Sequence, residues 1–158
     1  MNLFSRIFNN RQSLKECPRC LGKGDVDWDD IKRLDKELKW LPGSCAYCDG
    51  AGKVDSTIEN KVAVDTTYLA NNLSKKERKR IINQHPEAVE RASQFETQID
   101  EFIDQVYYLH LEANLNPGQI AHFFLISKER SESYEGEKQE LIEYIERVIL
   151  LKGSKSGS

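Results

Sequence analysis

The feature that most constrains this chain is a short string of cysteines and glycines that occurs twice. The pattern C-x-x-C-x-G-x-G is written as CPRCLGKG over residues 17–24 and as CAYCDGAG over residues 45–52. Each copy supplies two thiolates from one tight turn, and two such turns face to face supply the four ligands of a closed tetrahedral zinc site. We therefore predict one structural zinc ion with four ligands: Cys17, Cys20, Cys45 and Cys48.

The spacing of the two copies and their glycines is compatible with this site. Between Cys20 and Cys45 lie 24 residues, slightly more than the roughly 15 to 20 of common zinc sites of this kind. The longer loop costs only about 0.2 kcal/mol of closure free energy, against roughly 10 to 16 kcal/mol from zinc binding. We expect a positive φ at the glycines, so that backbone N–H groups point at the sulfurs: Gly22, Gly24, Gly50 and Gly52.

Two other uses of the cysteines remain open. C-x-x-C pairs also serve in thiol exchange, where a helix N-terminus lowers the pKa of the first cysteine. Here glycines follow both pairs and disfavour an immediate helix. A shell of four sulfurs also suits iron.

Composition indicates a soluble globular protein. Of the 158 residues, 39% are hydrophobic and 31% charged, with a net charge of −3, which favours neither a disordered chain nor a polyanion-binding one. Residues 1–12 lack the apolar core and cleavage site of a signal peptide, and no segment resembles a membrane span. We expect a cytoplasmic location, where reduced cysteines serve as metal ligands.

The chain divides into four expected segments. Residues 1–16 form an N-terminal amphipathic segment, 17–54 the zinc-binding module, 55–152 an α-helical domain and 153–158 a flexible tail. Within the module, apolar residues spaced by three and four over 28–41 predict an inserted helix of about three turns. The predicted fold is thus mainly α: a small four-cysteine zinc knuckle with an inserted helix, then a three- to four-helix bundle.

Capping signals locate the helices of this bundle. Ser74 and Glu77 form a capping box, and Pro86 suits the first turn of a long helix. Asn116 and Pro117 begin another helix, whose IAHFFLI run is expected at the centre of the core. The last helix is expected to end at Gly153. A short strand is expected over residues 61–64, and a helix over 1–12.

The two cysteine strings resemble repeats of the cysteine-rich zinc finger of DnaJ-type co-chaperones, and also the two-repeat zinc knuckle of anti-TRAP proteins. The resemblance covers residues 17–54 and implies that the four cysteines are zinc ligands. DnaJ proteins have four repeats that form two zinc centres, so the two repeats here correspond to the outer centre. The tripeptide His85-Pro86-Glu87 follows a basic segment, as His-Pro-Asp does in a J domain; the alternative is a simple corner between two helices.

The sequence favours a non-enzymatic protein that binds a protein partner. Its expected role is that of an adaptor, and a chaperone-like role is included in this expectation. A closed zinc shell offers no open position for catalysis, and no nucleophile with a nearby base is evident, so we expect no enzyme. The expected partner surface comprises Leu21, Tyr47 and the helix from Trp28 to Trp40; these residues pack the knuckle on the bundle in the alternative interpretation.

The sequence leaves two alternative functions open. A nucleic-acid regulator would use the basic cluster from Lys75 to Arg80, but seven carboxylates between Glu87 and Glu112 would repel a polyanion. The second alternative function is a thiol-disulfide oxidoreductase, which would use the C-x-x-C pairs. His110 and His122 lie on apolar helices and are expected to be hydrogen-bonded core residues rather than ligands.

Overall fold

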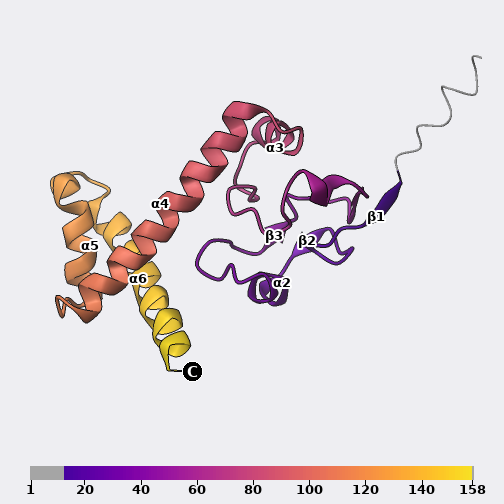
Figure 1. Ribbon diagram of the computed structural model, residues 1–158. Helices are drawn as coiled ribbons and strands as arrows, with labels where there is room; N and C mark the ends of the chain where they lie inside the picture. Colours follow the sequence, from indigo (N-terminus) through magenta and orange to yellow (C-terminus); the bar gives the residue numbers. More distant parts are fainter. Residues whose placement is uncertain (1–12, 158) are drawn as a thin grey trace, which may run out of the picture. The chain divides into compact units, whose positions relative to one another are not determined.

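The computed structural model describes residues 13–157 of a mainly α protein (Figure 1). Its contacts divide the chain into two compact units, one ending at Glu96 and the other beginning at Thr97. The elements are, in chain order, β1 (Leu14–Glu16), β2 (Asp25–Val26), α2 (Trp28–Arg33), β3 (Gly43–Ser44), β4 (Lys53–Asp55), η1 (Ile58–Asn60), α3 (Lys75–Ile82), α4 (Pro86–Leu111), α5 (Pro117–Leu125), η2 (Ile126–Lys128) and α6 (Tyr134–Ser156). The helix expected over residues 1–12 lies outside the described residues, and the segment boundaries expected from the sequence remain predictions.

Two small antiparallel sheets join the two cysteine turns crosswise. β1, which precedes the first turn, pairs with β4, which follows the second, with Lys15 opposite Val54. β2, which follows the first turn, pairs with β3, which precedes the second, with Val26 opposite Gly43. The strands before and after each turn are therefore held by the strands of the other turn, which brings the two turns face to face.

The inserted helix is shorter than predicted. α2 begins with a capping box between Asp27 and Asp30 and ends at Arg33. Asp35 has a left-handed φ of 56°, and the Lys36 N–H then donates to the carbonyl of Ile31, the hydrogen bond that closes a Schellman motif. The prediction of a helix of about three turns through residue 41 was wrong, because this turn redirects the chain after residue 34.

The strand expected over residues 61–64 is absent from the described part of the chain. The 3-10 helix η1 precedes this segment, which continues as turns. Ile58 and Val62 are four residues apart and both are buried, so one helical turn places both side chains in the core. The prediction of a strand was wrong because these apolar side chains follow the four-residue spacing of a helical turn and not the alternation of a strand.

Capping predicted the helices that follow. The Ser74 hydroxyl accepts a hydrogen bond from the N–H of Glu77 at the start of α3, and α4 begins at Pro86 as expected. Gln84, with a φ of 58°, turns the chain between the two helices. His85, Pro86 and Glu87 therefore lie at a corner between α3 and α4.

The second unit consists of the C-terminal part of α4 together with α5 and α6. α5 packs on α6, and the ring centroids of Phe102 and Phe124 are 4.8 Å apart. Ile120 and Ala121 are buried, whereas Phe123 and Ile126 are more than half exposed. Only part of the IAHFFLI run therefore contributes to the core, because a short helix on a small unit keeps one face in solvent.

The last helix passes its expected end. α6 continues through Gly153 to Ser156, and its C-cap is Gly157. No left-handed φ occurs at Gly153, so the residue does not terminate the helix, which includes residues 153–156 of the expected tail. Among the helices that the structure describes, none combines the length and apolarity needed to cross a membrane.

The core of the first unit is built around the cysteines. All four are buried in one cluster with Ile31, Trp40, Tyr47 and Leu69. The cysteine site is therefore part of the unit's hydrophobic core, and loss of its geometry would disturb that core.

Candidate metal centre

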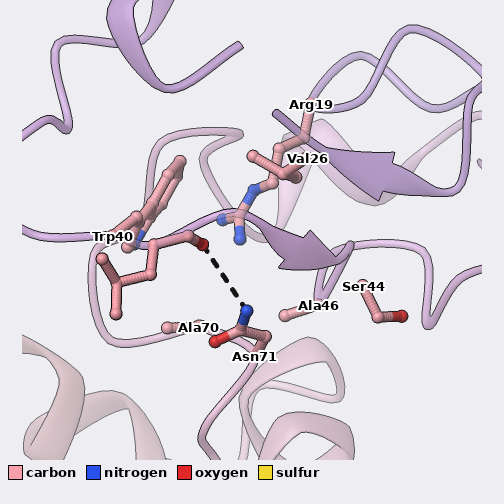
Figure 2. A pocket seen from close by; sticks show the side chains of 8 residues that line it. Arg19, Val26, Trp40, Ser44, Ala46, Ala70 and Asn71 are labelled. Atoms are coloured by element: carbon pink, nitrogen blue, oxygen red, sulfur yellow. Dashed lines mark hydrogen bonds between the residues drawn. The ribbon is translucent and has the colours of Figure 1, made fainter. Parts of the chain in front are cut away.

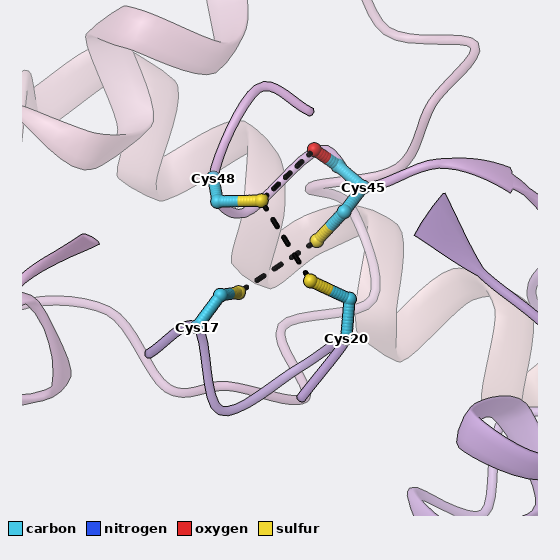
Figure 3. Close-up of side chains that lie close together, drawn as sticks. All are labelled: Cys17, Cys20, Cys45 and Cys48. Carbon is cyan, nitrogen blue, oxygen red and sulfur yellow. Dashed lines mark hydrogen bonds between the residues drawn. The ribbon is translucent and has the colours of Figure 1, made fainter. Parts of the chain in front are cut away.

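The four predicted cysteines meet at one point between the two turns (Figure 3). Their Sγ atoms all lie within 4.8 Å of one another. The Sγ atoms of Cys17 and Cys45 are 3.8 Å apart, as are those of Cys20 and Cys48. A tetrahedron with metal–sulfur bonds of about 2.3 Å has edges of about 3.8 Å, whereas a disulfide would bring the sulfurs to about 2.05 Å. The four cysteines are positioned to bind one metal ion.

Each turn holds its second cysteine through a glycine N–H. Gly24 donates to the Sγ of Cys20 over 3.3 Å, and Gly52 donates to the Sγ of Cys48 over 3.2 Å. Both glycines have positive φ, 85° and 74°, which L side chains adopt at a cost. The predicted role of these glycines is confirmed: the turn directs backbone donors at sulfurs that carry negative charge when they bind a metal.

The two turns obey an approximate two-fold symmetry. The N–H of Cys17 donates to the Gly52 carbonyl over 2.9 Å, and the N–H of Cys45 donates to the Gly24 carbonyl over 2.8 Å. A Cβ added at Gly24 would lie 2.6 Å from the Gly50 carbonyl oxygen. The backbones are thus in direct contact, and the repeated glycines are required both for the turn and for this close approach.

The thiols differ in acidity. A hydrogen bond with Cys45 lowers the pKa of Cys17 to about 5. The same contact, together with burial, raises the pKa of Cys45 far above its usual range, and burial raises that of Cys20. Without a metal, this contact therefore favours a negative charge on Cys17 over one on Cys45. Metal binding must release the remaining protons, so metal affinity falls as the pH falls.

Arg19, inside the first cysteine turn, is the largest buried side chain that the sequence did not reveal. Only 2% of its surface is exposed. Its Nε donates to the Val64 carbonyl over 2.8 Å, and its terminal nitrogens donate to the carbonyls of Thr66 and Leu69. Burial lowers its pKa to about 10, so the guanidinium stays charged at neutral pH. It ties the loop over residues 64–69 to the metal centre.

Two aromatic rings complete the surroundings of Arg19. Its guanidinium lies 4.2 Å from the centre of the Trp40 ring and 5.1 Å from that of Tyr47, distances at which cation–π attraction operates. Figure 2 shows Arg19 and Trp40 beside a cavity of about 20 Å³ that Ala70 and Asn71 also line. This volume holds about one water molecule, so the cavity is a packing defect rather than a ligand site.

A second buried polar network joins α4 to the loop that follows α2. The Lys36 ammonium donates to the Thr67 hydroxyl over 3.0 Å, and that hydroxyl donates to Glu96 over 2.7 Å. Lys39 also pairs with Glu96, at 3.3 Å. Although burial alone would raise the pKa of Glu96, the Thr67 hydrogen bond and the two lysines hold it below its usual value.

The expected partner surface is divided by the structure. Tyr47 is buried, and its hydroxyl donates to the Val62 carbonyl over 2.7 Å. Trp40 is buried as well, and its ring N–H donates to the Thr67 carbonyl over 2.9 Å. These two residues are buried in the core of the first unit and are not part of a partner surface, as the alternative required, but their partners lie in the segment between β4 and α3 rather than in the helical bundle. Leu21 and Trp28 are 51% and 45% exposed and remain accessible.

The remaining candidate residues have structural partners. Nδ1 of His110 lies 3.1 Å from the Leu115 carbonyl oxygen, and Nδ1 of His122 lies 2.7 Å from the Tyr134 hydroxyl. Both histidines are hydrogen-bonded as expected, but they are half-buried rather than core residues. In the basic cluster, Lys75 and Arg78 pair with Asp49.

Sequence reasoning missed Arg19, Lys36 and Glu96, which act over large sequence separations. The one available signal was the position of Arg19 between two cysteines of the repeated pattern, which is equivalent to the position of Tyr47 in the other copy.

Comparisons with models of protein families, with curated proteins and with solved structures each found no match to this chain.

Proposed function

We propose that this protein is a zinc-stabilised, non-enzymatic protein-interaction module that acts as an adaptor. One observation carries the proposal: four buried sulfurs lie within 4.8 Å of one another, two pairs of them are 3.8 Å apart, which is the edge length of a tetrahedral shell, and glycine N–H groups donate to two of them. A metal ion bound there has four protein ligands and no open position, which is the arrangement of structural rather than catalytic zinc. The ion therefore contributes folding free energy and fixes the shape of the first unit.

The pairing of the two cysteine turns supports the resemblance to the DnaJ-type zinc finger. The resemblance implies that two C-x-x-C-x-G-x-G copies form one zinc centre, and the strand pairs β1–β4 and β2–β3 here bring the two copies together around one cysteine cluster. We propose a chaperone-like or adaptor role on this basis. The corner at His85 is compatible with such a role and carries no independent weight.

Accessible apolar side chains on the first unit support an interaction function. Leu21, Trp28 and Leu41 are all at least 45% exposed, although nearby residues of the same unit bury their apolar groups. Large apolar side chains exposed beside a rigid scaffold are typical anchors for a protein partner.

The two alternatives receive less support. A nucleic-acid interface needs unpaired cations, yet Lys75 and Arg78 pair with Asp49, and Arg80 pairs with Glu77 and Glu87. A thiol oxidoreductase needs an accessible thiolate, whereas all four cysteines are buried.

Elemental analysis of natively purified protein tests the metal. We expect one zinc per chain and loss of that zinc in Cys45→Ser. Absence of a stoichiometric metal, iron in its place, or catalysed reduction of insulin disulfides by the purified protein would each contradict the proposal.

Cross-linking in the native cell, followed by mass spectrometry, tests the interaction function. The wild-type chain should link to a reproducible protein partner, and Cys45→Ser should lose that link, because the metal-free unit loses its shape. If the wild-type chain links to no protein above a tag-only control, the adaptor function is wrong.

A further inference from the structure

A groove of about 260 Å³ lies on the first unit between the second cysteine turn, β4, η1 and α3. Its floor is apolar and consists of groups that are buried in the core, among them Tyr47, Val54 and Ile58, with Ile82 of α3 along one wall. The metal-site residue Cys48 also lines it. The volume suits one or two side chains of a partner rather than a complete small molecule, which usually needs about 300 to 1,000 Å³.

The rim of this groove is positively charged. Lys53, Lys75, Arg78 and Lys79 line it, and Asp49 is the only carboxylate among its lining residues, which leaves three net positive charges in a chain whose net charge is −3. A zinc ion bound by four thiolates adds two negative charges beneath the floor, and the balance remains positive.

The four basic side chains of the rim differ in whether they form ion pairs. Asp49 pairs with Lys75 at 3.1 Å and with Arg78 at 2.9 Å. Among the described residues, the structure gives no ion pair to Lys53 or Lys79, and the buried Nε of Arg78 has no hydrogen-bond partner. An unused buried donor costs free energy.

These features point to a partner segment that carries carboxylates beside an apolar side chain. The apolar floor accepts a leucine-sized or phenylalanine-sized group, and the rim pairs with the flanking acids. The chain's own residues 1–12 contain Arg6 and Arg11 and no acidic residue, so they do not match the charge of the groove. A nucleic acid would need a longer row of cations, and two of the four here already have a carboxylate partner.

We propose that this groove is the docking site for a short acidic segment of a partner protein, with one apolar residue seated on the floor between Ile58 and Ile82. The assignment rests on the proposed interaction function and names the surface and the chemistry that it uses. Because Cys48 lines the groove, removal of the metal should abolish docking as well.

Peptide display against the full-length, zinc-loaded protein tests the assignment without prior choice of a ligand. The groove variant is Lys79→Glu, and the matched control is Lys76→Glu on the same helix, because Lys76 is also exposed but does not line the groove. Lys53→Gln changes the opposite wall as a second variant. Zinc content and circular dichroism of each variant should equal those of the wild type.

We expect the wild type and Lys76→Glu to enrich the same peptides, with aspartate or glutamate on both sides of leucine, isoleucine or phenylalanine. Measured by fluorescence anisotropy on a labelled selected peptide, affinity should fall about tenfold for Lys79→Glu and change less than about twofold for Lys76→Glu. Alanine in place of the peptide's apolar residue should also weaken binding about tenfold or more.

Several results would overturn the assignment: no enrichment above a blank surface, enrichment of basic or uncharged peptides, or equal binding by Lys79→Glu. Preferential binding of a single-stranded oligonucleotide, or self-association that Lys79→Glu abolishes in sedimentation velocity, would replace the acidic peptide with another occupant. If Lys79→Glu keeps the partner found by cross-linking in cells, the groove is wrong and the interaction function stands. A wild type with no cellular partner refutes that function independently.

Discussion

The contact between the two cysteine turns offers the sharpest test of the structure. Gly52 has a φ of 74°, and a Cβ added there would lie 2.4 Å from the carbonyl oxygen of Gly22. Real Cβ atoms essentially never approach closer than 3.0 Å, so the two backbones would have to separate by at least the 0.6 Å difference. That movement would pull on the Gly52 N–H that donates to Cys48 and on the carbonyl that accepts from Cys17.

The expected cost of Gly52→Ala has two parts. An alanine in the left-handed region costs roughly 1 to 2 kcal/mol, and forcing an extra carbon into a tight contact costs typically 1 to 3 kcal/mol. The total is about 2 to 5 kcal/mol. Because metal binding and folding of this unit are coupled, the apparent zinc affinity should fall by about thirty-fold to a few thousand-fold.

A competition titration with a chromophoric zinc chelator measures this change, and chemical unfolding of the zinc-loaded protein measures the loss of stability. Gly136→Ala in α6 is the control, because nothing lies within 4 Å of its added Cβ, and alanine should stabilise a helix by about 0.5 to 1 kcal/mol. If Gly52→Ala binds zinc as tightly as the wild type, the two turns do not meet as described.

Three further predictions follow from the same contacts. Arg19→Met removes a buried donor from three carbonyls and should cost about 3 kcal/mol or more in urea unfolding, whereas a change below about 1 kcal/mol would contradict its role. Because the pKa of Glu96 is lowered in the folded state, its contribution to stability is present above the ordinary value of 4.5 and is lost as the pH falls below it. In Glu96→Gln, the melting temperature at fixed zinc concentration should therefore fall less steeply as the pH is lowered below 4.5. An unchanged dependence on pH would contradict the ion pairs of Glu96 with the lysines. Strong chelation should remove near-ultraviolet signals of Trp40 but keep the helical signal of residues 97–158, because their core is separate; complete loss of helix would show that the units depend on each other.

The helices of the C-terminal part were predictable because their signals are local. Ser74 and Asn116 cap helices through a hydrogen bond to the N–H three residues later, and Pro86 begins α4 for reasons of its own ring geometry. The cysteine site was predictable for a similar reason. Each turn is specified within eight residues, and only the meeting of two copies required the fold.

The errors came from segments whose neighbours lie far along the chain. The periodicity of residues 28–41 favours a helix throughout. In the structure, however, Lys36 and Trp40 lie beyond the end of α2, where their side chains donate hydrogen bonds to Thr67. β2 and β3 contain two residues each, too few to show alternation in the sequence, and only their pairing with each other in the fold identifies them as strands. Gly153 was expected to end a helix, but nothing in its surroundings requires a left-handed residue there.

The sequence by itself determined which cysteines form the cluster, the turns that carry them and most helix starts, because the repeated cysteine–glycine pattern, glycine φ and N-capping act within a few residues. The tertiary structure alone decided which aromatic residues are buried, where Arg19 donates its hydrogen bonds and that a basic rim surrounds an apolar floor. These properties depend on residues that lie far apart in the sequence, such as Asp49 and Arg78 at a separation of 29 and Arg19 and Leu69 at 50. No local pattern encodes such a pairing, since the free energy that selects it is released only when the chain has folded.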